Sequence, residues 1–133
     1  MRIVAGSRKG ARIFAPKGLD TRPTGDRVRE AVFNLLGPVD DADVLDLYAG
    51  SGAMGLEALS RGARRVTFVE SDREAVETIL RNLDKLRLEG AVVLREDAGR
   101  KLAADVVRGR RYDLVLVDPP YAMLARILPT LAA

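Results

Sequence analysis

Three glycines, Gly50, Gly52 and Gly55, follow a short apolar run that contains Asp46. A glycine turn between a strand and a helix lets a ligand approach the backbone, and the first turn of the helix offers unpaired N–H groups. The spacing therefore predicts a nucleotide-binding turn. It does not select the cofactor, because Gly-x-Gly-x-x-Gly with Glu70 about 20 residues further on also fits an NAD site.

Two carboxylates follow the second and third expected strands. Glu70 ends the second strand, where a carboxylate can accept hydrogen bonds from both ribose hydroxyls. Asp97 follows the third strand, where it can accept from an exocyclic amine such as that of adenine. Asp97 and Asp46 each have a structural alternative to ligand binding. Asp97 could cap the next helix, and Asp46 could hold the loop. Together with the glycines, the carboxylates indicate one crevice for a ligand rich in hydroxyl and amino groups.

The segment Asp118-Pro119-Pro120-Tyr121 follows a fourth apolar run. Its prolines fix the backbone and remove two N–H donors, which leaves the Asp118 carboxylate and free carbonyl groups as acceptors. Such acceptors can hold an exocyclic NH2 group while the Tyr121 ring stacks on a heterocycle. The alternative is that the prolines only end the strand.

Alternating strands and helices must position these residues. Strands are expected over 44–48, 66–70, 91–94 and 112–117, and helices over 53–61, 99–108 and a segment opened by the capping box Ser71-x-x-Glu74. The apolar face expected for that last helix consists of Val76, Ile79, Leu80, Leu83 and Leu86. The run Leu114-Val-Leu-Val117 lacks polar alternation, which is typical of strands buried on both faces. The pattern predicts an open α/β sheet of parallel strands, with ligands at their carboxyl ends.

The first 36 residues carry a net charge of +5, and the remainder carries −2. Two β-like runs at 2–6 and 11–16 predict a hairpin. A helix is expected over 25–36, ending at Gly37-Pro38, with one apolar face formed by Val28, Ala31, Val32, Leu35 and Leu36. The charge indicates a polyanionic partner, although a solvated surface explains it equally well.

Composition narrows the remaining possibilities. A chain of 133 residues is enough for one domain with a core, and no apolar run approaches the ~20 residues of a membrane span. The chain has no cysteine and no histidine, which removes thiolate chemistry, the commonest general base and the commonest metal ligand. We therefore expect no metal site and no membrane partner, and a cytoplasmic location is the default.

The motifs, taken in order, resemble a known family. Asp46-x-x-x-Gly50-x-Gly52 with Asp118-Pro-Pro-Tyr121 resembles the S-adenosylmethionine-dependent amino-methyltransferases of the Rossmann-like class. A closer resemblance, over the whole chain, is to the bacterial 16S ribosomal RNA (guanine-N2) methyltransferases called RsmD. It is carried by Arg2-Ile-Val-Ala-Gly6, Arg22-Pro-Thr-x-Asp-Arg-Val-Arg-Glu-Ala-Val-Phe-Asn-Leu-Leu36 and Asp46-Leu-Tyr-Ala-Gly-Ser-Gly52. Tyr48 stands where many methyltransferases have a further glycine, and RsmD-like sequences have an aromatic residue there.

The resemblance implies a role for each matching residue. S-adenosylmethionine would be bound by Thr24, Arg27, Asp46, Tyr48, Ala49, Gly50, Ser51, Gly52, Glu70, Ser71, Asp97 and Ala98. The target guanine would be held by Asp118, Pro119, Pro120 and Tyr121. RNA phosphates would be bound by Arg2, Arg8, Lys9, Arg12, Lys17 and Arg22. Residues 1–38 would form the RNA-binding extension, and residues 39–133 the first four strands of the cofactor-binding domain.

The implied reaction transfers a methyl group to the exocyclic N2 of a guanine in 16S rRNA, with guanine-966 as the expected target. The substrate would be that RNA or a small-subunit assembly particle, and the full-length enzyme a monomer. The sulfonium donor is already electrophilic, so the protein mainly needs to position the reactants. Hydrogen bonds from the amine to Asp118 and Pro119 would localise its lone pair and aim it at the methyl carbon.

Three other functions are compatible with parts of the sequence. An NAD-dependent oxidoreductase explains the glycines and Glu70 but leaves Asp118-Pro-Pro-Tyr121 without a role. A non-catalytic RNA-binding module is favoured if the chain lacks parts that turnover needs. An adenine-N6 methyltransferase shares the reaction, because Asp-Pro-Pro-Tyr does not select the base.

The family that the chain resembles continues beyond the fourth strand with strands that complete the sheet. Leu114–Val117 would therefore be an apolar edge strand here, with unpaired backbone groups. The sequence accordingly favours a C-terminally incomplete sheet.

Overall fold

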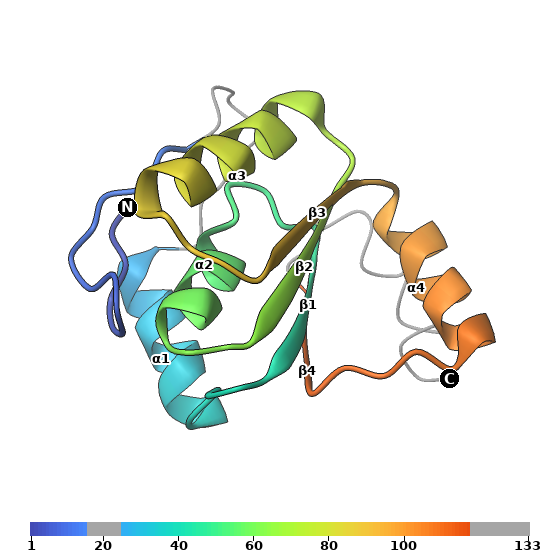
Figure 1. Cartoon of the computed structure of the whole chain (residues 1–133), viewed down its shortest axis with the longest axis horizontal. Helices are drawn as coiled ribbons and strands as arrows, with labels where there is room; N and C mark the ends of the chain where they lie inside the picture. Colours follow the sequence, from blue (N-terminus) through green and yellow to red (C-terminus); the bar gives the residue numbers. More distant parts are fainter. Residues whose placement is uncertain (16–24, 118–133) are drawn as a thin grey trace.

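A computed structural model describes residues 1–15 and 25–117 of the chain. Four parallel strands form one sheet in the order β3-β2-β1-β4 (Figure 1). The strands are β1 (Asp43–Leu47), β2 (Arg65–Glu70), β3 (Ala91–Arg95) and β4 (Leu114–Val117). The helices are α1 (Asp26–Leu36), α2 (Ala53–Ser60), α3 (Arg73–Leu86) and α4 (Ala98–Arg108). The predicted parallel α/β sheet is confirmed, with element ends that differ from the expected ones by one or two residues.

Helices cover the sheet on both faces. Leu56 of α2 and Ile79 of α3 pack with Phe68 of β2 in one apolar cluster, and Leu102 of α4 packs with Leu45 of β1 in a second. Figure 1 accordingly shows α1, α2 and α3 on one side of the strands and α4 on the other. Alternate residues of β1 and β2 therefore serve opposite cores, as expected for a sheet buried between helical layers. No helix in the described ranges is long and apolar enough to cross a membrane.

β4 departs from the predicted burial on both faces. Leu116 is buried, but Val115 is 37% exposed, and within the described residues β4 pairs only with β1. The strand also begins at Leu114 instead of Tyr112. Just before it, the Asp113 carboxylate accepts a hydrogen bond from the backbone N–H of Asp43 at 2.7 Å. Among the described strands, β4 thus lies at an edge of the sheet, as predicted.

The predicted apolar face of α1 is wrong. The helix buries Arg29 and Phe33, whereas Val28 is 56% exposed and Leu35 89% exposed. The orientation has a physical cause, because Arg29 pairs with the fully buried Glu57 of α2. An ion pair inside the protein cannot be left unmade, so it determines which side of the helix faces inward.

The capping box predicted at the start of α3 is also wrong. The N-cap is Asp72, whose carboxylate accepts from the backbone N–H of Ala75 at 3.0 Å. The backbone N–H of Asp72 itself donates to Glu70 at 2.7 Å. This bond ties the start of the helix to the end of β2. The helix buries Ile79 as expected, but it leaves Leu80 half-exposed.

The predicted N-terminal hairpin is present as a single antiparallel bridge between Arg2 and Arg12. Ile3 and Ile13 are buried in the same cluster as α1 and α2, so the hairpin is part of the core. Its turn lies against the end of α2, where a Cβ on Gly6 would stand 1.9 Å from the carbonyl oxygen of Ser60. With φ of +87° as well, that position accepts only glycine.

Candidate functional site

The turn after β1 is built from backbone in the left-handed region. Tyr48, Gly50 and Gly52 have φ of 57°, 58° and 82°. For Tyr48 this conformation costs roughly 1–2 kcal/mol. A glycine at this position, as many methyltransferases have, would avoid that cost. Hydrogen bonds hold the turn: Ala49 N–H donates to the Val69 carbonyl at 3.0 Å, and Gly52 N–H to the Ala49 carbonyl at 2.8 Å.

The three glycines have different surroundings. A Cβ on Gly50 would meet nothing closer than 3.9 Å, so its bare face is open to a ligand. A Cβ on Gly52 would lie 3.1 Å from the Ile79 side chain, and one on Gly55 would lie 2.3 Å from the Phe68 ring. Gly55 therefore allows α2 to pack on the sheet, and ligand approach is left to the turn at Gly50.

Asp46 lies at the base of this turn and is 3% exposed. Its Oδ2 accepts a hydrogen bond from the backbone N–H of Gly55, at 3.1 Å, in the first turn of α2. Asp46 thus links β1 to the first turn of α2, a contact on the far side of the loop that it was expected to hold. Ser51 beside it is also buried, and its Oγ accepts from Ala53 N–H at 3.4 Å.

Glu70 ends β2 next to the turn. One carboxylate oxygen accepts from the backbone N–H of Gly50 at 3.0 Å, and the other accepts from that of Asp72 at 2.7 Å. The residue is only half-buried, and each carboxylate oxygen can accept a second hydrogen bond. Glu70 therefore orders the glycine turn and keeps acceptor capacity on its open side.

Asp97 and Ala98 lie at the same edge of the sheet, just beyond β3. Glu70 pairs in register with Arg95, two residues before Asp97, and Arg95 Nε donates to the Ser71 carbonyl at 3.4 Å. Asp97 is exposed and caps α4, accepting from Arg100 N–H at 3.0 Å. Its structural alternative is therefore observed, and within the described residues its second carboxylate oxygen has no hydrogen-bond partner.

Other predicted site residues are placed less fully. Arg27 is exposed on α1. Thr24 and the segment Asp118–Tyr121 lie outside the described residues. β4 ends at Val117, which pairs with Leu47, the residue before the Tyr48 turn. The fourth strand therefore ends at the same edge of the sheet as the glycine turn.

Asn82 is a residue of this site that sequence reasoning missed. It is fully buried on α3, and its Nδ2 donates to the Ser51 carbonyl at 3.3 Å and to the Phe14 carbonyl at 3.0 Å. Its Oδ1 accepts from the Phe14 N–H at 2.7 Å. One amide thus joins the glycine turn to the hairpin. The only signal in the sequence is an asparagine amid the apolar positions of the helix.

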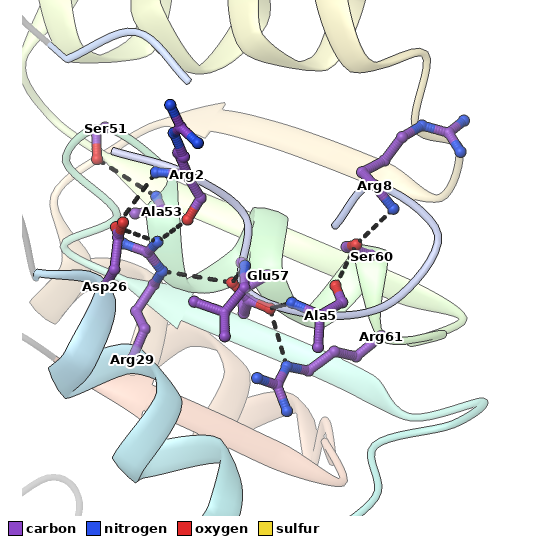
Figure 2. A network of polar contacts seen from close by, with 12 residues as sticks. Arg2, Ala5, Arg8, Asp26, Arg29, Ser51, Ala53, Glu57, Ser60 and Arg61 are labelled. Carbon is purple, nitrogen blue, oxygen red and sulfur yellow. Dashed lines mark hydrogen bonds and ion pairs between the residues drawn. The ribbon is translucent and has the colours of Figure 1, made fainter. Parts of the chain in front are cut away.

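A buried ionic network anchors the hairpin to α1 and α2 (Figure 2). Glu57 has no exposed surface, and it accepts from the backbone N–H groups of Val4 at 2.8 Å and Ala5 at 3.0 Å. Arg61 Nε lies 2.9 Å from the same carboxylate, and Arg29 Nε lies 3.5 Å from it. Because all these donors converge on one side chain, Glu57 is the centre of the anchor.

The outer end of this network includes Asp26, 2.7 Å from Arg29, which in turn donates to the Arg2 carbonyl. Burial acts to raise the pKa of Asp26, but hydrogen bonds from the Arg2 N–H and from Arg29 outweigh it and hold that pKa below its ordinary value. The Asp26 carboxylate is therefore ionised at neutral pH.

The predicted RNA-binding residues fall into two groups. Arg8 is engaged with the protein: its Nε donates to the Leu86 carbonyl at 2.5 Å, and a terminal nitrogen donates to the Arg87 carbonyl at 3.0 Å. Arg8 thus caps the carboxyl end of α3. The side chains of Arg2, Lys9 and Arg12 are exposed, and Lys17 and Arg22 lie outside the described residues.

A second ionic cluster lies at the opposite edge of the sheet, where β1 begins. Asp43 Oδ2 lies 2.8 Å from Arg65 and 2.7 Å from Arg110. Hydrogen bonding by Arg65, aided by Arg110, outweighs burial and keeps the pKa of Asp43 below its ordinary value. Burial, with a hydrogen bond to Asp105, raises the pKa of Tyr112 to about 12.

An open parallel sheet with a glycine turn after its first strand defines a Rossmann-like class, and solved structures of that class resemble this chain. It superimposes on the "Putative methyltransferase yhhF from Escherichia coli" with a TM-score of 0.83 and 36% identity, covering 99% of this chain and 71% of that one. A hypothetical protein of Thermus thermophilus gives a TM-score of 0.87 at 35% identity, covering 99% and 77%. A "SAM Dependent Methyltransferase" of Agrobacterium tumefaciens gives 0.65 at 27% identity, covering 77% and 34%.

The family model described as "Conserved hypothetical protein 95" matches residues 1–133, and the chain belongs to that family. It is 46% identical over 123 residues to the "Putative rRNA methyltransferase YlbH" of Bacillus subtilis, covering 91% of this chain and 67% of that protein. It is 43% identical over 122 residues to the "Ribosomal RNA small subunit methyltransferase D" of Escherichia coli K12, covering 91% and 60%. The predicted RsmD-like family is confirmed, and the chain spans about three fifths to two thirds of these relatives' length.

Proposed function

We propose that this chain forms the cofactor-binding part of an enzyme that transfers a methyl group from S-adenosylmethionine to the exocyclic N2 of a guanine in 16S rRNA. The observation that carries the proposal is the pairing of Gly50 with Glu70 at the carboxyl edge of the sheet. The bare face of Gly50 and the spare acceptors of Glu70 suit a ribose with two hydroxyl groups. Relatives named as rRNA methyltransferases support the choice of reaction.

The residues present fit that cofactor. The Glu70 carboxylate would accept from the ribose hydroxyls, and the free oxygen of Asp97 would accept from the adenine amine. The turn from Tyr48 to Gly52 would hold the methionine end, with Asp46 keeping the turn in place through Gly55. When bound, S-adenosylmethionine supplies an electrophilic methyl group, so the protein needs no metal to activate it.

The segment that follows β4 would bind the target base. We propose that Asp118 and the Pro119 carbonyl accept hydrogen bonds from the guanine amine, that Pro120 keeps this segment rigid, and that Tyr121 stacks on the ring. The amine loses a proton after transfer, either to Asp118 or to water. Asp118→Ala should largely abolish transfer while S-adenosylhomocysteine affinity stays near that of the parent chain. If Asp118→Ala instead lost cofactor affinity and retained turnover, Asp118 would act on the cofactor and not on the base.

Incubation with 16S rRNA and labelled cofactor, followed by digestion to nucleosides and mass spectrometry, tests the reaction. N2-methylguanosine is the expected product, and N6-methyladenosine would instead support the adenine-specific alternative. Thermal stabilisation by S-adenosylhomocysteine but not by NADH separates a methyltransferase from an oxidoreductase. RNA binding without stabilisation by S-adenosylhomocysteine would favour the non-catalytic RNA-binding alternative. A cytoplasmic location and a monomeric full-length enzyme remain predictions.

A further inference from the structure

Phe14 is an aromatic residue that the core does not use. The other two phenylalanines, Phe33 and Phe68, are at most 1% exposed, whereas Phe14 is 38% exposed and belongs to neither apolar cluster. Two cations of α3 lie over its ring: the Arg81 guanidinium carbon is 4.2 Å from the ring centroid, and Lys85 Nζ is 4.8 Å from it. An exposed ring with two cations over it combines the aromatic and basic groups that surfaces binding single-stranded nucleic acid use.

The backbone that carries the ring is held by hydrogen bonds, although the ring itself is exposed. The Phe14 backbone is clamped on both sides by the buried Asn82 amide, at 2.7 Å and 3.0 Å. Lys85 Nζ also donates to the Arg12 carbonyl at 2.8 Å, which fixes the ammonium beside the ring. Less conformational freedom is therefore lost when a ligand binds here than on a free loop.

The segments that carry the ring and its two cations bear further exposed basic residues. Lys9, Arg12 and Arg87 are exposed on the hairpin and just after α3. Of the carboxylates on the same helix, Glu77 pairs with Arg73 at 3.2 Å, and Glu74 and Asp84 are exposed. A ligand that contacts Arg81 and Lys85 together with the ring would therefore be both planar and anionic.

We infer that Phe14, Arg81 and Lys85 form a platform, called the Phe14 platform below, that stacks an unpaired base of the substrate RNA and neutralises its flanking phosphates. The inference rests on the proposed function and extends the RNA-binding surface from the hairpin to α3. Single-stranded RNA is the ligand, because the ring can only stack on a base that is not already paired. Asn82, which holds the Phe14 backbone, also donates to the Ser51 carbonyl. The platform is therefore tied to the same residue that supports the glycine turn.

Exchange of the ring is the first test. Phe14→Leu keeps an apolar side chain but removes the π face, and Phe14→Tyr keeps the ring as the matched control. Fluorescence anisotropy with a single-stranded 16S rRNA fragment should show affinity reduced roughly 5- to 150-fold for Phe14→Leu and nearly unchanged for Phe14→Tyr. Equal affinity for all three proteins, or equal loss in both variants, would overturn the platform.

Neutralisation of the cations is the second test. Arg81→Gln with Lys85→Gln should reduce the slope of log affinity against log salt by up to about 1.4 for single-stranded RNA. Arg108→Gln is the control, because Arg108 is exposed at the end of α4, on the other side of the sheet. Its slope should match the parent chain. A double variant with an unchanged slope would show that both cations only cover the ring.

Two further measurements separate this inference from the proposed function. S-adenosylhomocysteine affinity and the melting temperature should be the same in Phe14→Leu and the parent chain. If the parent chain binds RNA through the ring but does not bind S-adenosylhomocysteine, the proposed function fails and the platform stands. If it methylates 16S rRNA and Phe14→Leu binds RNA as tightly, the platform fails and the reaction stands.

Discussion

Glu57 and Glu70 are two glutamates that each accept two backbone hydrogen bonds, yet they differ in what they leave available. Glu57 is fully buried, and its remaining acceptor capacity is taken by Arg29 and Arg61. Glu70 is half-buried, and within the described residues its recorded partners are two backbone N–H groups. The difference indicates that a carboxylate saturated by protein donors maintains the fold, whereas one with spare acceptors facing solvent is suited to a ligand.

Removal of Glu57 should have the largest effect on stability. Glu57→Ala removes the fully buried carboxylate beside Arg29, which keeps Asp26 as a partner, and leaves the hairpin N–H groups without acceptors. This should cost about 3–5 kcal/mol of unfolding free energy. Urea denaturation measures it. Glu77→Ala is the matched control, because Glu77 is 57% exposed, and it should change stability by less than about 0.5 kcal/mol. A cost below about 1 kcal/mol for Glu57→Ala would contradict a structural role.

Removal of Glu70 should mainly affect the ligand. Glu70→Ala should weaken S-adenosylhomocysteine binding by about 1.5–3 kcal/mol, since hydrogen bonds to a charged group are lost. Isothermal calorimetry gives the affinity, and Glu96→Ala serves as an exposed control beyond β3. Unchanged affinity in Glu70→Ala would remove the distinction between the two glutamates.

Asn82 lies between these extremes, because it contacts both the hairpin and the glycine turn. Asn82→Ala leaves buried backbone groups of Phe14 and Ser51 without partners, which should cost about 1–3 kcal/mol of stability. Hydrogen exchange should show faster opening at both segments, and the exposed Asp84→Ala provides the control on the same helix. Faster exchange in the hairpin alone would mean that the amide does not couple the two regions.

The glycine turn could be predicted from sequence because its determinants are contiguous. Gly50, Gly52 and the apolar run before them specify a strand, a turn and a helix within one short segment. The hairpin anchor could not be predicted in this way, since Val4 and Glu57 are 53 residues apart and only the folded chain brings them together. The same contact explains the error on α1, where periodicity favoured Val28 and Leu35 but the buried partner of Arg29 determined the orientation.

The second limit on prediction from the sequence concerns residues that are suited by type to more than one role or position. Ser71 and Asp72 are both good helix caps by type, and the choice of Asp72 depends on the bond from its N–H to Glu70 on the preceding strand. Arg8 fits a phosphate-binding residue by charge, and its guanidinium also donates to carbonyl groups at the end of α3, a contact that the sequence does not indicate. Residue type gives the chemistry that is possible, and tertiary contacts select which part of it is used.

The smallest expected effect is a pH dependence at Asp43, a carboxylate that is 8% exposed and whose partners, Arg65 and Arg110, reach it from the rim of the sheet. Its pKa in the folded protein is lowered from the ordinary 3.8. A lowered folded-state pKa means that the stabilisation is complete above the unfolded-state value and is lost as pH falls through the folded-state value. The stability difference between the parent chain and Asp43→Asn should therefore be constant near neutral pH and shrink only under acid conditions. Urea denaturation across that range measures it, with the 88%-exposed Asp41→Asn as control. A difference that grows on acidification would show that the two arginines do not favour the ionised form of Asp43.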